Sequence, residues 1–180
     1  MIVSGAVIKG EIAGAVIERA VAGDEVAFAR IVAVHHEDME RIAFLVSGDL
    51  DVAADAVQAA WAIAWRTLGK LRDPSRLKAW LMSVAANEAR QIMRSQRRRT
   101  VRELAVDGSA GSRDPDRAAL IDLANAVAAL DHKDRTLIGM RYIAELGSDA
   151  IGRELGLSAS GVRVRLHRLL GRLRTELGDD

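Results

Sequence analysis

The sequence predicts an all-α fold of two small helical domains joined by a flexible linker, the C-terminal domain being a helix-turn-helix. Apolar residues recur at helical spacing along most of the chain. The only prolines among the 180 residues are Pro74 and Pro115, so long stretches lack helix breakers. The stretch TVRELAVDGSAGSR loses the periodicity and gathers glycine, serine and charge, which indicates a linker over residues 100–113. We therefore expect one domain over residues 11–99 and a second over residues 114–178.

The first domain is expected to contain helices over residues 11–22, 24–48, 51–67 and 75–99. Gly23 and Gly48 are suited to end the first two helices, because glycine readily adopts the backbone conformation of a C-terminal stop. Asp24 is suited to cap the second helix through a side-chain oxygen. The tryptophans lie on the apolar stripes of their helices, which favours burial in the core over stacking on a nucleic-acid base. They are Trp61, Trp65 and Trp80.

The second domain begins with a helix that Asp114 caps and in which Pro115 occupies the first turn. The apolar side of this helix is expected to consist of Leu120, Leu123, Val127 and Leu130. Asp131 caps the next helix, and Asp134 follows three residues later in a capping-box-like pattern. Ser148 is expected to cap the short helix DAIGREL that comes after it.

The end of the chain has the helix-turn-helix pattern: this short helix, the turn Gly-Leu-Ser at 156–158, and a longer basic helix over 159–177. The long helix contains VRVRLHR, whose alternation would by itself indicate a strand. At about 100° per residue, however, the large apolar side chains gather on one face. They are Val162, Leu166, Leu169, Leu170, Leu173 and Leu177. The opposite face presents Ser160, Gly161, Val164 and Arg168, with His167 beside them and Arg163 and Arg165 on the flanks.

The charges are clustered, although the formal net charge is only +1. Acidic residues concentrate between residues 24 and 55, and arginines concentrate in residues 90–102 and 163–174. Two basic clusters in a nearly neutral chain favour local contact with a polyanion. Solvated helix faces would give the same clusters, and a plain helical hairpin would give the same C-terminal pattern, so the residues alone leave both interpretations open.

A duplex-binding interpretation of the long helix assigns a role to each outward residue type. Small residues at its start permit close approach to DNA, and Arg168 is suited to donate to the O6 and N7 atoms of guanine. Val164, apolar yet outward, is suited to a thymine methyl group. Arg163 and Arg165 would pair with phosphates.

Several other classes of site are not supported. The chain has no cysteine, which excludes a disulfide scaffold and a thiolate metal site. The histidines form no HExxH-type pair, and the adjacent His35, His36 and Glu37 point in different directions on a helix. No phosphate loop or nucleophile elbow occurs, and no apolar run reaches the roughly 18 residues of a membrane span. We therefore expect a soluble cytoplasmic protein that inserts in no membrane, is not an enzyme and uses no metal or cofactor.

The segment LDHKDRTLIGMRYIAELGSDAIGRELGLSASGVRVRLHRLLGRLRTEL resembles the C-terminal domain of extracytoplasmic-function (ECF) sigma factors of the sigma-70 family. The N-terminal half resembles the same family independently. AGDEVAFARIV is similar to the family's opening helix, ADAVQAAWAIAWRTLGKLR to its polymerase-binding helix, and RLKAWLMSVAANEARQIMRSQRRR to its promoter-element helix. The resemblance extends over about residues 18–177, with the domains in the family's order and a linker between them.

The resemblance implies that the chain binds core RNA polymerase and directs initiation at promoters with minus-35 and minus-10 elements. The helix-turn-helix would read the minus-35 element through Ser160, Arg163, Val164, Arg165, His167 and Arg168. The basic helix of the first domain would bind the minus-10 element through Asn87, Arg90, Arg94, Arg97 and Arg98. The loop at 71–76 occupies the position of the family's base-recognition loop.

Polymerase contact is implied for Asp51, Asp55 and Gln58. The family usually has an acid after the glutamine, where this chain has Ala59, so the contact is expected to be weaker or to shift toward Asp51 or Asp49. An anti-sigma factor is a further partner that the resemblance implies. The alternative is a stand-alone helix-turn-helix regulator that binds duplex DNA without polymerase, and binding to core polymerase distinguishes the two.

Overall fold

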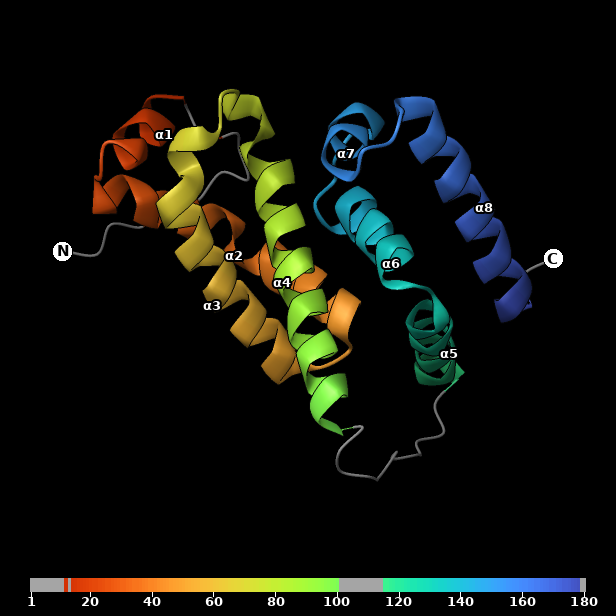
Figure 1. The fold of residues 1–180 in the computed structure, drawn as a ribbon. Coiled ribbons are helices and arrows are strands. Elements are labelled where there is room, and N and C mark those ends of the chain that lie inside the picture. Colours follow the sequence, from red (N-terminus) through yellow and green to blue (C-terminus); the bar gives the residue numbers. More distant parts are fainter. Residues whose placement is uncertain (1–11, 13, 101–114, 179–180) are drawn as a thin grey trace.

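The structure, a computed structural model, describes residue 12, residues 14–100 and residues 115–178, and the regular elements in this part of the chain are all helices. Figure 1 shows the first domain as a helical bundle. Its helices are α1 (Gly14–Val21), α2 (Glu25–Ser47), α3 (Leu50–Thr67) and α4 (Leu77–Thr100). Two short 3-10 turns, η1 (Leu68–Lys70) and η2 (Pro74–Arg76), connect α3 to α4. The predicted linker lies outside the described residues, apart from Thr100 at the end of α4.

The second domain contains α5 (Pro115–Ala129), α6 (His132–Ile138), a π-helical turn η3 (Gly139–Ile143), α7 (Ser148–Leu155) and α8 (Ala159–Leu177). The all-α prediction is therefore confirmed, including the helical state of VRVRLHR within α8. Helix α1 is described from Gly14, and the predicted start at residue 11 lies outside the described residues. Helix α4 begins after η2 rather than at residue 75.

Alanines allow the helices of the first domain to pack closely. Large apolar side chains of α2, α3 and α4 are fully buried between the helices: Ile31, Met39, Ile42, Val46, Val57, Leu81 and Met82. Small buried residues line α3 and α4 where the helices meet: Ala53, Ala56, Ala60, Ala64, Ala85, Ala86 and Ala89. Because small side chains reduce the distance between helix axes, α2, α3 and α4 form one compact bundle.

The predicted helix ends at Asp24 and Gly48 are confirmed. Asp24 accepts a hydrogen bond from the Ala27 amide at 3.0 Å, and Gly48 ends α2 in the left-handed conformation with φ +75°. Asp49 caps α3 by accepting from the amides of Asp51 and Val52. These local bonds satisfy backbone groups that a helix end leaves free and so fix the turns between α1, α2 and α3.

In the second domain, the predicted Asp131 cap is confirmed, whereas the predicted Ser148 cap is wrong. Asp131 accepts a hydrogen bond from the Asp134 amide at 2.8 Å. The N-cap of α7 is Gly147, which is extended and provides no side-chain bond, so Ser148 already belongs to the helix. Leu123 was expected on the apolar side of α5 but is exposed. Only part of that side meets α8, where Ala126 and Leu130 are buried.

The helix-turn-helix is held by a tight turn. Gly156 ends α7 with φ +68°, and Ser158 caps α8 by accepting from the Gly161 amide at 3.0 Å. A Cβ at Gly152 would lie 2.5 Å from the Leu157 carbonyl oxygen. The close approach of this turn to α7 therefore requires glycine at position 152.

The two domains pack against each other in this structure. Helix α2 contacts α6 and η3, and α4 contacts α7 and α6. Gly139 of η3 lies so close to Ile42 and Leu45 that an added Cβ would be 3.1 Å from both side chains. Figure 1 shows α6 and α7 beside α4, with α8 on the far side of the second domain.

Among the buried residues of the core, His35 of α2 is a titratable group. Burial, together with the nearby positive charge of Lys78, lowers the pKa of His35 to about 4, and Asp38 offsets this only in part. Glu145, from the turn after η3, lines the same cavity as these three side chains. His35 is therefore neutral at neutral pH.

We predict that replacing Gly152 by alanine destabilises the protein, because the new methyl group meets the backbone carbonyl of Leu157. Overpacking of this kind costs about 1–3 kcal/mol. Gly171→Ala is the matched control, because position 171 of α8 has no atom within 4 Å of an added Cβ and alanine raises helix propensity there by up to about 1 kcal/mol. Urea denaturation measures both, and equal stability of the two variants would contradict the packing described for the turn.

We predict that the free energy of unfolding falls as the pH decreases from about 6.5 to 4 because His35 stays neutral in the folded state. The pKa of His35 is lower in the folded than in the unfolded chain, so its contribution is complete above pH 6.5 and is lost toward pH 4. The loss from this group is at most about 3 kcal/mol. Urea denaturation at several pH values should show that His35→Gln loses less unfolding free energy between pH 6.5 and 4 than the unsubstituted protein does. The exposed control His167→Gln should lose as much as the unsubstituted protein.

Candidate nucleic-acid interface

The outward face of α8 carries most of the residues predicted to bind duplex DNA. Ser160, Arg163, Val164, His167 and Arg168 are exposed. The opposite face is buried against the rest of the domain through Val162, Leu166, Leu169 and Leu173. An apolar side chain exposed among basic ones on a helix-turn-helix has the chemistry needed to contact a base edge.

Arg165 is in a different position from the other candidate residues of α8. Its Nε donates to Asp134 Oδ1 at 2.6 Å, and its Nη2 lies 3.8 Å from Asp131 Oδ2. Asp134 is buried, so this ion pair joins the start of α8 to the start of α6. The guanidinium predicted to bind a phosphate is thus also a structural link within the domain.

The second set of candidate residues lies along one face of α4. Asn87 is exposed, and its Oδ1 accepts a hydrogen bond from Arg90 Nη2. Burial, and in second place the charge of Arg94, lowers the pKa of Arg90, which is half-buried. Arg94 is exposed. Arg97 and Arg98 belong to α4, but their side chains lie outside the described part of the structure.

Two more polar residues continue this face toward the start of α4. Ser83, Asn87 and Arg90 follow one another by four and three residues, which places them on one side of α4. Arg76, the last residue of η2, directly precedes α4 and reaches the same carboxylate that lies beside Ser83. We call Arg76, Ser83, Asn87 and Arg90 the polar stripe. Its side chains comprise two guanidinium groups, a hydroxyl and an amide, which are the groups that most often contact DNA phosphates.

The second domain covers the polar stripe. Glu154 of α7 accepts hydrogen bonds from Nη2 and Nε of Arg76 at 2.5 and 3.2 Å. Its other oxygen lies 3.4 Å from the Ser83 hydroxyl, which also has a shorter hydrogen bond, at 2.8 Å, to the Trp80 carbonyl. A cavity of about 290 Å³ follows, lined by Asn87 and Arg90 on one side and by Lys133, Thr136 and Arg165 on the other. No sequence pattern predicted the Arg76–Glu154 contact, because its partners are 78 residues apart.

The predicted polymerase-binding residues lie together on α3. Asp51, Asp55 and Gln58 are exposed and follow one another by four and three residues, so they share a face. Ala59 is half-buried beside this face. The Asp49 side chain caps α3, so it is engaged by the backbone.

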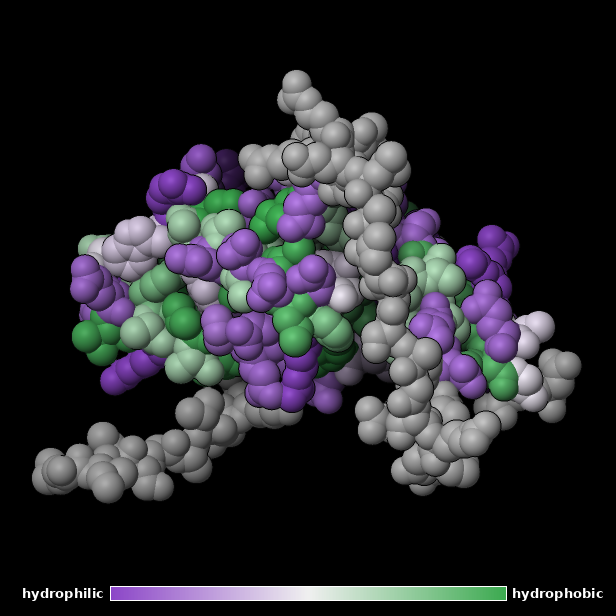
Figure 2. Space-filling model, turned by 90° about the horizontal axis from the view of Figure 1, so that it is seen from below, coloured by the Kyte–Doolittle hydropathy of each residue, from purple (hydrophilic) through white to green (hydrophobic). Residues whose placement is uncertain are grey.

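Exposed apolar residues lie near the start of α3. Phe44 near the end of α2 is 44% exposed, and Leu50 at the start of α3 is 73% exposed. Figure 2 views the end of the molecule at which α3 begins and shows hydrophobic residues interspersed with hydrophilic ones. Apolar groups beside an acidic surface are suited to a protein partner with a mixed polar and apolar face.

The tryptophans are less buried than the sequence predicted. Trp61 is half-buried and donates from Nε1 to His36 Nδ1 at 3.1 Å, and Trp80 is also half-buried. The expectation of a core position is wrong for Trp65, which is 42% exposed. Its ring packs edge-on against Phe28 with centroids 4.8 Å apart, so one side of the ring is covered while the side chain stays exposed.

No helix in the described ranges is long and apolar enough to cross a membrane.

Two parts of the chain match known families. Residues 31–99 match Sigma-70 region 2, and residues 120–173 match Sigma-70, region 4. The first match contains α3 and all but the last residue of α4, and the second contains the helix-turn-helix up to Leu173.

Related proteins match most of this chain. The ECF RNA polymerase sigma factor SigL of Mycobacterium tuberculosis is 31% identical over 149 residues, which cover 79% of this chain and 84% of SigL. The probable RNA polymerase sigma factor RfaY of Xanthomonas campestris pv. campestris is 31% identical over 172 residues, or 88% of this chain. The chain spans only 42% of the length of RfaY.

A solved structure is similar over almost the whole chain. CnrH, determined in complex with the cytosolic domain of CnrY, is 25% identical and matches with a TM-score of 0.70. The match covers 92% of this chain and 97% of CnrH. From the two matched regions and these relatives, we conclude that the chain belongs to the extracytoplasmic-function sigma factors of the sigma-70 family, the promoter-specificity subunits of RNA polymerase.

Proposed function

We propose that this sigma factor binds core RNA polymerase through α3, the minus-10 element through α4 and the minus-35 element through α8. The observation that carries the proposal is that one acidic and two basic surfaces occur on three separate helices of one chain. The α3 surface is acidic, whereas the α4 and α8 surfaces are basic. A protein that joins polymerase to two promoter elements needs separate surfaces of this kind.

The minus-35 contact is assigned to the outward face of α8. Its N-terminal half presents Ser160, Val164 and Arg168 at helical spacing, all of them exposed. A recognition helix reads base edges with such residues, and Arg163 and His167 are placed to contact the flanking backbone. Arg165 contributes through its ion pair with Asp134, which sets the position of α8 on α6.

The minus-10 contact is assigned to Asn87 and to the arginines of α4. The Asn87 amide is exposed and can both donate and accept, which suits a captured base. Single-stranded DNA is bound in basic grooves, and Arg90 and Arg94 follow Asn87 along α4. Arg97 and Arg98 extend the same basic sequence.

The polymerase contact is assigned to Asp51, Asp55 and Gln58. They form an exposed acidic and amide surface on α3, with the exposed Leu50 beside it. The half-buried Ala59 carries no charge, so we assign the electrostatic part of the contact to Asp51 and Asp55.

A further partner, an anti-sigma factor, is proposed from the family. CnrH, whose structure is similar to this chain, was solved with the cytosolic domain of CnrY bound. We infer that this chain acts in the cytoplasm, as the specificity subunit of a polymerase and without catalytic activity of its own.

We predict that the double substitution Asp55→Ala/Gln58→Ala weakens binding to core polymerase about tenfold, as expected when central contacts of an interface are removed. Fluorescence titration of labelled core polymerase with the full chain measures the affinity. The matched control is Asp122→Ala/Gln91→Ala, which removes one exposed acid and one exposed glutamine from α5 and α4. Equal affinities of the two double variants would overturn the assignment of the α3 surface.

We predict that Val164→Ser changes the preference of the holoenzyme at one thymine of the minus-35 element, because it removes an apolar contact to the methyl group. The change should be several-fold in run-off transcription from promoters that differ at that base pair. Val26→Ser, at an exposed valine of α2, is the control that leaves the preference unchanged. A promoter profile identical to that of the unsubstituted protein would show that Val164 does not meet a base.

A further inference from the structure

Glu154 is a buried carboxylate that the second domain places on the polar stripe of the first. Its side chain is 8% exposed, and its Oε1 accepts from two nitrogens of Arg76 of the other domain. Its Oε2 lies 3.4 Å from the Ser83 hydroxyl, whose shorter hydrogen bond, at 2.8 Å, goes to the Trp80 carbonyl. A buried acid is stable only where donors replace its water, and the guanidinium of Arg76, which supplies them here, belongs to the stripe assigned to DNA. The carboxylate of Glu154 thus joins the second domain to the polar stripe, the surface assigned to DNA.

The geometry at Arg76 is suited to phosphate as well as to carboxylate. Two nitrogens of one guanidinium point at one oxygen of Glu154, at 2.5 and 3.2 Å. Arginine binds carboxylates and phosphates through the same fork of donors. A hydroxyl such as that of Ser83 is also a frequent phosphate donor. Arg76 and Ser83 therefore form an anion site in line with Asn87 and Arg90.

Basic groups face each other across the remainder of this contact. Arg90 from α4 meets Lys133 and Arg165 from the second domain around the cavity of about 290 Å³, which Glu154 also lines. Asp134 compensates Arg165. Arg90 is half-buried and donates to the Asn87 amide oxygen rather than to a carboxylate of the described residues, and burial lowers its pKa. Such a cavity would be better filled by a polyanion than by the docked domain.

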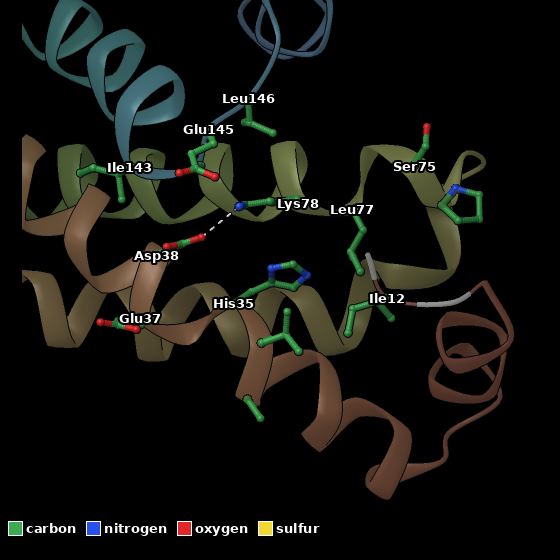
Figure 3. Close-up of a pocket in the computed structure, with 14 residues that line it drawn as sticks. Ile12, His35, Glu37, Asp38, Ser75, Leu77, Lys78, Ile143, Glu145 and Leu146 are labelled. Atoms are coloured by element: carbon green, nitrogen blue, oxygen red, sulfur yellow. Dashed lines mark ion pairs between the residues drawn. The ribbon is translucent and has the colours of Figure 1, made fainter. Parts of the chain in front are cut away.

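The rest of the contact between the domains is incompletely packed. Figure 3 shows a second cavity, of about 590 Å³, in which Glu145 and Leu146 of the second domain lie over the Asp38–Lys78 ion pair of the first. His35 lines it, and its buried Nδ1 has no hydrogen-bond partner among the described residues. Interfaces between domains that contain cavities and polar contacts are typical of domains that separate and re-associate.

We propose that Glu154 occupies the place of a DNA phosphate at Arg76, so that the docked second domain and promoter DNA exclude each other on the polar stripe. Arg76 is then a phosphate-binding residue of the minus-10 surface, and Glu154 is its competitor within the chain. The inference rests on the proposed function, because it takes the polar stripe to be the minus-10 surface. Docking lowers the apparent DNA affinity in proportion to the fraction of docked chains.

The experiment measures docking and DNA binding on the same full-length chains. Because the sequence has no cysteine, Arg30→Cys on α2 and Arg172→Cys on α8 provide two exposed sites for spin labels. Electron-electron resonance between the labels reports the separation of the domains. Fluorescence anisotropy with a random single-stranded oligodeoxynucleotide reports DNA affinity, and run-off transcription with core polymerase reports sigma activity.

The two partners of the ion pair are expected to behave differently. Glu154→Gln should broaden the label distances toward longer values and raise DNA affinity about fivefold, as expected when a docked state is released. Arg76→Gln should broaden the distances equally but leave DNA affinity at or below that of the unsubstituted chain, because the phosphate contact is lost. The exchange Arg76→Glu/Glu154→Arg should restore the short distances without restoring DNA affinity. Glu176→Gln, the same charge change at an exposed position of α8, should alter neither quantity.

Two results would overturn the inference. One is that Glu154→Gln leaves the distances and the DNA affinity unchanged, and the other is that Arg76→Gln raises DNA affinity as much as Glu154→Gln does. Failure of the proposed function gives a different result, namely no promoter-dependent transcript from the unsubstituted chain with core polymerase. The transcription assay therefore separates the two failures.

Discussion

The packing of α4 is the constraint on which the rest of the structure depends. One side of α4 is lined by alanines and packs closely against α2 and α3, where Leu81 and Met82 complete the core. Because that side is fully buried, Asn87 and Ser83 point away from it. Arg76, at the end of η2 directly before α4, lies beside Ser83 at Glu154. The same close packing thus builds the core of the first domain and presents the polar stripe to its surroundings.

The charge pattern of the chain acquires a structural meaning from this arrangement. The net charge is nearly zero because an acidic surface on α3 balances basic surfaces on α4 and α8. Two ion pairs also fix the side chains of individual arginines. Asp134 fixes Arg165, and Glu154 occupies Arg76. Asp134 thus forms an ion pair within the second domain, whereas Glu154 forms one between the domains. Only the ion pair of Glu154 competes with a DNA phosphate.

The sequence was sufficient to predict the features that depend on neighbouring residues. The caps at Asp24 and Asp131, the stop at Gly48 and the helix-turn-helix all rest on bonds within a few positions, and all are present. Ser148 was misplaced as a cap because Gly147, which has no side chain to signal the boundary, takes that position. Trp65 and Leu123 were misplaced because periodicity predicts which face of a helix is apolar, but not how far other helices cover it.

The contacts that control the candidate sites depend on distant residues and were not predictable from one sequence. Arg165 carries the same charge as Arg163 and Arg168, and only the fold brings Asp134 to it. Arg76 had no predicted partner, and Glu154 lies 78 residues away on a helix of the other domain. Residue types predicted which surfaces are suited to nucleic acid, whereas their accessibility follows from how the domains pack.

The central claim is that α4 and α8 of one chain contact two different promoter elements when the chain is bound to polymerase. Site-specific photo-crosslinking tests it most directly, with a photoreactive amino acid at Asn87 or at Val164 in a holoenzyme–promoter complex. The account predicts crosslinks from position 87 to single-stranded DNA at the minus-10 element and from position 164 to duplex DNA at the minus-35 element. Crosslinks from both positions to the same element would contradict it. So would a crosslink from position 164 that forms equally well without polymerase, with none from position 87.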